Sequence, residues 1–227
     1  MPVPPFLPFS ETMVCADNLD ACRAYIESLL VAEPPELEKF EAQYRRMPRA
    51  QPPIGLQVST FLTWLIAVMQ ARKVIELGTA LGYSTLSLAA ALKTTGGRLI
   101  AVESDSEMVA ATAKNLQAAG LQDQVDLIHG DAEETLSKLQ GSFDLILQDA
   151  GKASYPVLLP RCYQLLRPGG VFAMDDALFL PMGVRADLSD PVDLAVRKLF
   201  QEDCWKATLL PIGDGLALAW KKFSNLS

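Results

Sequence analysis

The chain has 227 residues and half of them are hydrophobic, which is enough for one sizeable core. It carries 20 basic against 27 acidic side chains, a formal net charge of −7. Because nucleic-acid binding needs clustered Lys and Arg, this balance argues against a nucleic-acid partner and favours small-molecule chemistry. Four scattered cysteines and a single histidine argue against a zinc site. With no export signal and no run of about 20 apolar residues, we expect a cytoplasmic protein without a membrane span.

The first fifty residues differ from the rest of the chain. The proline-rich residues 1–16 predict an extended arm, and helices are predicted at 17–31, 35–46 and 57–70, with Pro34-Pro35 and the loop 47–55 between them. We therefore expect two parts, an N-terminal arm with its helices over 1–50 and a main domain over 51–227.

From Lys73 onward, short apolar runs alternate with helical segments. The runs lie at 73–77, 98–103, 124–129, 143–148 and 170–175, and the predicted helices lie at 83–93, 106–119, 131–139, 154–166 and 191–202. Apolar strands that alternate with helices predict a doubly wound α/β fold with a mostly parallel sheet. Two further strands, 206–212 and 215–221, are joined by Gly213-Asp214 and predict a C-terminal antiparallel hairpin, giving seven strands.

The segment VIELGTALGYSTL (74–86) is the most informative. A strand is followed by Gly78 and Gly82 and then by a helix, so backbone amides and Ser84 can face a ligand such as a carboxylate. A tight turn without a ligand is the alternative, and a dinucleotide site would call for G-x-G-x-x-G. Glu103 ends the next strand, where a carboxylate can accept ribose hydroxyls, a feature shared by several nucleoside cofactors.

The third strand leads into HGDAEE (129–134). Asp131 either lies beside an adenine or caps the following helix, with Glu134 completing a capping box, and both roles can coexist. His129 stands alone next to an apolar strand, and we assign it no chemistry.

Three acidic residues follow the fourth and fifth strands. Neighbouring parallel strands end side by side, so Asp149 is predicted to face Asp175 and Asp176. Three converging carboxylates repel one another unless a cation lies among them, and oxygen ligands suit Mg²⁺ or Ca²⁺. The alternative is that some of these acids point to solvent or cap a helix. Lys152 is either a solvated loop residue or, with its pKa lowered by a neighbouring cation, a general base.

Taken together, these motifs resemble the cation-dependent O-methyltransferases, the family of caffeoyl-CoA O-methyltransferase, with catechol O-methyltransferase a more distant relative. The resemblance runs from about residue 50 to 222 and is carried by VIELGTALGYSTL, LIAVES, HGDA, FDLILQDAGKASY, LLRPGGVFAMDD and LPIGDGLAL. It implies an S-adenosylmethionine site and a divalent cation, Mg²⁺ or else Ca²⁺ or Mn²⁺. The predicted cofactor residues are Ile54, Glu76, Gly78, Thr79, Gly82, Ser84, Glu103, Ala132 and Asp149. The predicted metal ligands are Asp149, Asp175 and Asp176, and the predicted catalytic residues are Lys152 and Asp149.

The sequence departs from the family pattern at the acidic residues. Asp176 stands where the family usually has Asn, and Gly151 replaces the second Asp of the D-A-D-K motif. We expect an O-methyltransferase that acts on a vicinal dihydroxy aromatic, forms a homodimer and uses residues 1–50 as a substrate and dimer cap. The alternatives are a metal-independent small-molecule methyltransferase, a nicotinamide-dependent oxidoreductase and a non-catalytic binding module.

Overall fold

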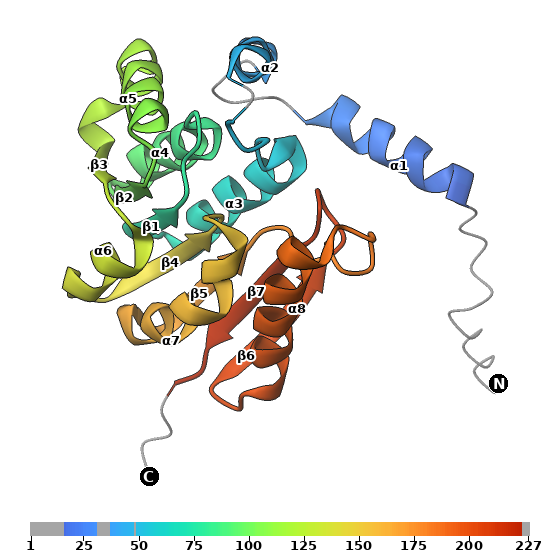
Figure 1. Ribbon diagram of the computed structural model, residues 1–227. Coiled ribbons are helices and arrows are strands. Elements are labelled where there is room, and N and C mark those ends of the chain that lie inside the picture. Colours follow the sequence, from blue (N-terminus) through green and yellow to red (C-terminus); the bar gives the residue numbers. More distant parts are fainter. Residues whose placement is uncertain (1–15, 31–36, 48, 224–227) are drawn as a thin grey trace, which may run out of the picture. The chain divides into compact units, whose positions relative to one another are not determined.

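The computed structural model describes residues 16–30, 37–47 and 49–223. Within them, a seven-stranded sheet has the order β3-β2-β1-β4-β5-β7-β6 (Figure 1). Its strands are β1 (Lys73–Leu77), β2 (Arg98–Glu103), β3 (Val125–His129), β4 (Phe143–Gln148), β5 (Leu166–Met174), β6 (Trp205–Leu210) and β7 (Leu216–Lys221). The first five are parallel, and β7 runs antiparallel to both β5 and β6. This confirms the predicted doubly wound sheet with its antiparallel C-terminal hairpin.

Helices cover both faces of the sheet. One face carries α3 (Gly55–Met69), α4 (Tyr83–Thr95) and α5 (Ser106–Ala119), and the other carries α6 (Ala132–Lys138), α7 (Tyr155–Leu165) and α8 (Ala186–Gln201). Two short 3₁₀ helices, η2 (Gln122–Gln124) and η3 (Lys152–Ser154), lie in the connections. Successive strand residues serve opposite cores, with Val74 in the first and Ile75 in the second. Because both faces are buried, the strands need continuous apolar runs.

Two predicted starts differ from the structure by four or five residues. Helix α8 begins at Ala186, not at residue 191, so Pro191 lies inside the helix, where its missing N–H removes one helical hydrogen bond. Strand β5 begins at Leu166, not at residue 170. Its pairing with β4 shifts between Phe143↔Leu166 and Leu145↔Val171, so the Pro-Gly-Gly segment is an irregularity within the strand, where such residues are tolerated.

The chain divides into two units, Met1–Val31 and Ala32–Ser227. The first contains α1 (Ala16–Leu29), and the second contains α2 (Leu37–Arg46) and the whole sheet. Within the second unit, Phe40 of α2 is buried edge-on against Tyr83, with ring centroids 5.6 Å apart. The predicted arm before Ala16 and Pro34-Pro35 lie outside the described residues, and the division into 1–50 and 51–227 stays a prediction.

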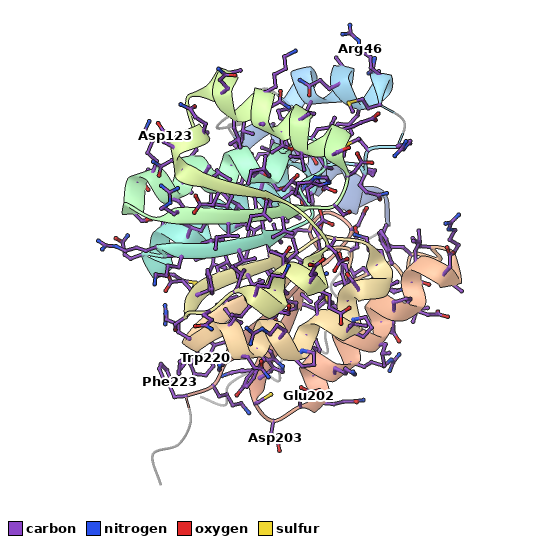
Figure 2. All side chains as sticks on the ribbon, turned by 60° about the vertical axis from the view of Figure 1, so that its left-hand side comes forward. Arg46, Asp123, Glu202, Asp203, Trp220 and Phe223 are labelled. Atoms are coloured by element: carbon purple, nitrogen blue, oxygen red, sulfur yellow. The ribbon has the colours of Figure 1, made fainter. Side chains whose placement is uncertain are left out.

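The C-terminal hairpin extends the sheet beyond β5, and its turn lies beside the carboxyl end of β5, because Met174 at the end of β5 pairs with Ala217 at the start of β7. Val171 near the start of β5 pairs with Trp220 near the end of β7, and Trp220 meets Phe223 edge-on at 5.6 Å between centroids (Figure 2). An open α/β sheet binds its ligand at the carboxyl ends of the parallel strands, so we expect the site there. Among the described helices, none is long and apolar enough to cross a membrane.

Candidate active site

The turn after β1 brings the backbone close to the end of β4. Gly78 has φ +88°, and a Cβ added to it would lie 2.7 Å from the carbonyl carbon of Asp149 and overlap that residue's carbonyl oxygen. Only glycine fits both the left-handed conformation and this close approach. Gly82 caps α4 without any side-chain hydrogen bond, so the first amides of α4 have no capping side chain. The turn is therefore compact, with Gly78 and Ala80 half-buried and Gly82 buried.

Glu103 at the end of β2 is fixed by backbone amides from two loops. Its Oε2 accepts hydrogen bonds from the amides of Thr79 and Ala80, both at 3.0 Å, and its Oε1 accepts one from the amide of Asp105 at 2.9 Å. The hydroxyl of Ser104 also lies within 3.5 Å of Oε1 and donates a long hydrogen bond to it. The three amides hold the carboxylate in one orientation and join the ends of β1 and β2.

A cavity of about 530 Å³ lies over the carboxyl ends of the parallel strands, a volume typical of small-molecule sites. Four of the predicted cofactor residues line it: Gly78, Glu103, Ala132 and Asp149. Lys152, the predicted base, also lines this cavity. The cofactor residues predicted from four different strand ends, those of β1, β2, β3 and β4, therefore line one cavity.

The other five predicted cofactor residues are buried and are not among the residues that line the cavity. They are Ile54, Thr79, Gly82, Ser84 and Glu76, the last of which is fully buried in β1. Both carboxylate oxygens of Glu76 lack a hydrogen-bond partner among the described residues. Burial raises the pKa of Glu76 to about 8, and the nearby hydroxyls of Ser84 and Thr85 oppose that shift only in part. An unpartnered buried carboxyl is costly, so this position suits a ligand group that donates hydrogen bonds.

Several lining residues were not predicted from the sequence. They include Arg49, Gln51, Ser104, Met108, Asp187 and Leu188. Met108 could have been found from the sequence. It is an apolar residue in the first turn of α5, and this turn begins at Ser106, just after the capping residue Asp105 that follows β2. Arg49 and Asp187 come from segments far from the strand ends in sequence. Arg49 pairs with Asp105 at 2.9 Å, which joins the loop before α3 to the loop after β2.

The residues after β3 have mainly a capping role. Asp131 caps α6 by accepting a hydrogen bond from the amide of Glu134 at 2.9 Å, as predicted, and it also lines the cavity. The predicted capping box is incomplete, because the Glu134 side chain pairs with Lys138 at 2.6 Å. A ring nitrogen of His129 lies 3.2 Å from the carbonyl oxygen of Ser104.

The three predicted acids converge after β4 and β5. Asp149, Asp175 and Asp176 each offer one oxygen within 4.8 Å of the others. Asp176 holds φ +63°, a conformation that Asp tolerates better than most residues. Asp175 is 4% exposed, and its Oδ1 has no hydrogen-bond partner among the described residues. This orphaned oxygen and the all-oxygen donor set fit a hard divalent cation.

The shifted pKa values of these acids reflect burial and crowding. Burial raises the pKa of Asp149 to about 6, although Lys152 opposes the shift. Burial, together with Asp149 and Asp176, raises the pKa of Asp175 well above its ordinary value. Burial also raises the pKa of Asp176, again against Lys152. The protein's own groups therefore leave the negative charge of the cluster only partly compensated.

Lys152 is buried in the cluster, not solvated. Its ammonium lies 3.0 Å from Asp149 Oδ1 and 2.9 Å from the Tyr155 hydroxyl, and it forms an ion pair with Asp176 Oδ2. It also lies 5.9 Å from the ring centre of Phe179. Burial alone would lower the pKa of Lys152, but the Tyr155 hydroxyl and the carboxylates of Asp149 and Asp176 outweigh it and raise the pKa above its ordinary value. The protein's own groups therefore raise the pKa of Lys152, whereas the sequence predicted a pKa lowered by a neighbouring cation.

The sheet order, the C-terminal hairpin and a cavity over the first strand ends define a class I methyltransferase architecture. Residues 27–222 match the family model described as O-methyltransferase. The chain is 31% identical over 206 residues to the mouse catechol O-methyltransferase domain-containing protein 1, covering 87% of this chain and 78% of that protein. It is also 31% identical over 179 residues to catechol O-methyltransferase of Mycobacterium tuberculosis, covering 78% of this chain and 80% of that enzyme.

Solved structures agree with these sequence relatives. The O-methyltransferase TomG from Streptomyces achromogenes, determined in complex with S-adenosylmethionine, superposes with a TM-score of 0.79 at 28% identity, over 89% of this chain and 96% of that one. This protein belongs to the O-methyltransferase family and is an S-adenosylmethionine-dependent O-methyltransferase. The oxidoreductase alternative is therefore set aside.

Proposed function

We propose that this enzyme transfers the methyl group of S-adenosylmethionine to one hydroxyl of a vicinal dihydroxy aromatic, with the help of a divalent cation. The observation that carries the proposal is the convergence of Asp149, Asp175 and Asp176 beside the cavity, with an unpartnered oxygen on buried Asp175. The name of one relative, catechol O-methyltransferase of Mycobacterium tuberculosis, supports this substrate class.

In this proposal the cofactor lies in the cavity over the ends of β1, β2 and β3. Glu103, oriented by three amides, accepts a hydrogen bond from the ribose, and the amides that begin α4 after Gly82 face the methionine carboxylate. Glu76 accepts hydrogen bonds from the methionine ammonium, which would satisfy its unpartnered oxygens. Ile54, Thr79, Ser84 and Ala132 complete the predicted cofactor set by packing around it.

The acceptor would bind where the cavity meets the acid cluster. Asp149, Asp175 and Asp176 would hold the cation, Mg²⁺ or else Mn²⁺ or Ca²⁺, which when bound lowers the pKa of a coordinated hydroxyl. Lys152 lines the cavity beside these acids and is the side chain placed to take the proton from the acceptor. Its raised pKa keeps it protonated among the protein's own groups, so this role needs the surroundings of its ammonium to change. Much of the rate would come from positioning the acceptor oxygen in line with the methyl group.

A second candidate is a metal-independent O-methyltransferase. One observation favours it, since Lys152 already pairs with two of the three acids and supplies them with a positive charge. In that case the acids would serve to hold the lysine and the β4 and β5 ends together.

The test is methyl transfer from labelled S-adenosylmethionine to a panel of catechols and matched monophenols. We expect transfer to catechols in the presence of Mg²⁺ and little transfer in EDTA, with monophenols poor acceptors in both. Equal transfer with and without EDTA would favour the metal-independent candidate. No transfer to any phenol, despite binding of S-adenosylhomocysteine, would overturn the substrate class and revive the non-catalytic alternative.

Assembly and location belong to the same proposal. A homodimer, with residues 1–50 as substrate and dimer cap, is supported by the apolar outer side of α3, where Trp64 is 58% and Val68 60% exposed. A cytoplasmic location is supported by the cysteines within the described residues, Cys22, Cys162 and Cys204, which are unpaired. Light scattering on the full chain should give the mass of a dimer, and on a chain without residues 1–50 it should give the mass of a monomer.

A further inference from the structure

The ammonium of Lys152 occupies the interior of the acid cluster. It contacts Asp149 Oδ1 at 3.0 Å and Asp176 Oδ2, and the lysine itself is only 9% exposed. Of the three acids, only Asp175 has no ion pair with it and keeps an unpartnered oxygen. Two of the three acids are therefore already paired with a positive charge that belongs to the chain.

The negative charge of the cluster can accommodate both the ammonium of Lys152 and a divalent metal ion. Three carboxylates and one ammonium carry a formal net charge of −2, which one divalent cation would neutralise. Two positive charges that share carboxylate oxygens lie close enough to repel strongly in a buried site. Each one therefore weakens the binding of the other.

Asp176 is the residue at which the two positive charges meet. Its Oδ2 contacts the lysine, and a carboxylate has a second oxygen with acceptor positions of its own. An asparagine at this position would offer a single neutral oxygen, which cannot serve both partners with the same strength. The carboxylate is thus suited to bridge Lys152 and a bound cation.

We propose that Lys152 is a built-in competitor for the divalent cation, and that Asp176 is the carboxylate which the two share. This inference rests on the proposed function of the cluster as a cation site. It assigns the chain's own lysine a role in setting cation affinity, in addition to its proposed role toward the acceptor hydroxyl.

The test is a calorimetric titration of Mn²⁺, and separately of Mg²⁺, into four proteins without any acceptor. They are the wild type, Lys152→Gln, Asp176→Asn and the double variant, with Lys138→Gln as a control that removes a surface lysine paired with Glu134. We expect Lys152→Gln to bind the cation about tenfold more tightly than the wild type, because the like charge is gone. In the Asp176→Asn background, Lys152→Gln should raise the cation affinity only about threefold, since the shared carboxylate is missing. The Lys138→Gln control should match the wild type.

Removing one partner of a buried ion pair can destabilise the fold, so two further checks are needed. Near-ultraviolet circular dichroism shows whether Lys152→Gln is folded, and Lys152→Arg keeps the charge in nearly the same place. The arginine variant should bind Mn²⁺ with an affinity close to the wild type; if it instead binds as tightly as the glutamine variant, charge competition is wrong.

Failure of this inference differs from failure of the proposed function. Equal Mn²⁺ affinity of the wild type and Lys152→Gln would overturn the competition, while cation-dependent turnover of the wild type would leave the proposed function intact. If no variant binds Mn²⁺ or Mg²⁺, the competition is overturned, and turnover in EDTA then decides between the metal-dependent and metal-independent reactions.

Discussion

The cavity wall over β1 and β2 and the acid cluster after β4 and β5 lie on the same edge of the sheet, yet they are built differently. At the first, one carboxylate, Glu103, accepts three backbone hydrogen bonds at 2.9–3.0 Å. At the second, Asp149 and Asp176 depend on a single lysine side chain, and Asp175 keeps an unpartnered oxygen. The first region is organised by its own backbone, whereas the second has a surplus of buried negative charge.

This difference indicates how each region should respond to change. Backbone hydrogen bonds and close packing fix a geometry before a ligand arrives, so substitutions in the first region should alter cofactor affinity. A cluster with uncompensated charge responds to cations, protons and its lysine, so substitutions in the second should alter turnover. The predictions below test that separation.

The largest expected effect follows removal of the lysine. Lys152→Ala should lower turnover about 100- to 10,000-fold, because it removes the side chain placed to take the acceptor's proton. The affinity for S-adenosylhomocysteine should stay within about threefold, since the contacts of Glu103 are unchanged. Steady-state kinetics and calorimetry measure the two quantities. A parallel loss of cofactor affinity would show that the two regions are not separable.

Gly78→Ala should damage the first region through the backbone. The new Cβ would overlap the backbone of Asp149 at a residue with φ +88°, so we expect a loss of about 2–4 kcal/mol in the free energy of unfolding and much weaker cofactor binding. Gly96→Ala is the matched control. It has φ +69° and nothing within 4 Å of the added Cβ, so it should cost only about 1 kcal/mol. Denaturant unfolding that gives equal losses for both variants would contradict the close packing.

Glu103→Gln should weaken cofactor binding about tenfold while turnover at saturating cofactor changes little. The amide keeps the shape of the side chain but removes its charge and one acceptor, and hydrogen bonds to charged groups contribute about 1.5–3 kcal/mol. Glu107→Gln, an exposed acid in the first turn of α5, is the control and should bind normally. If turnover falls and the cofactor affinity is unchanged, Glu103 acts in the methyl-transfer step, like the acid cluster, and not in cofactor binding.

The smallest effect concerns stability and pH. The pKa of Asp149 is raised to about 6 and that of Glu76 to about 8, so the folded protein holds these protons more tightly than the unfolded chain, whose carboxyls titrate near 4. Their contribution to stability is therefore present at low pH and is lost as the pH rises from about 4 to about 8. In EDTA the melting temperature should fall over this range, and Glu76→Gln should make the fall shallower between pH 6 and 8. An unchanged slope in that variant would show that Glu76 does not titrate there.

Much of the first region could be predicted from the sequence because its signals are local. Apolar strands, Gly78 after β1 and Glu103 at the end of β2 can each be recognised from neighbouring residues. What the sequence could not show is that Glu103 accepts hydrogen bonds from Thr79 and Ala80, because that depends on how two loops approach each other. Arg49 and Asp187 were missed for the same reason, since they reach the cavity from distant segments.

The acid cluster was harder to predict in detail. Strand order correctly placed Asp149 opposite Asp175 and Asp176, because neighbouring parallel strands end together. The burial and the pKa of Lys152 could not be predicted from the sequence, since both depend on which oxygens surround the ammonium in three dimensions. Sequence spacing allowed a solvated lysine or one with a lowered pKa, and the structure has a buried lysine whose pKa is raised.

The most direct test is a crystal structure of the protein with S-adenosylhomocysteine and Mg²⁺. The account predicts the nucleoside in the cavity with its ribose at Glu103, and one metal ion bound by an oxygen from each of Asp149, Asp175 and Asp176. It would be contradicted by a structure with the nucleoside in place but no ion among these acids at high Mg²⁺, and Lys152 still held between Asp149 and Asp176.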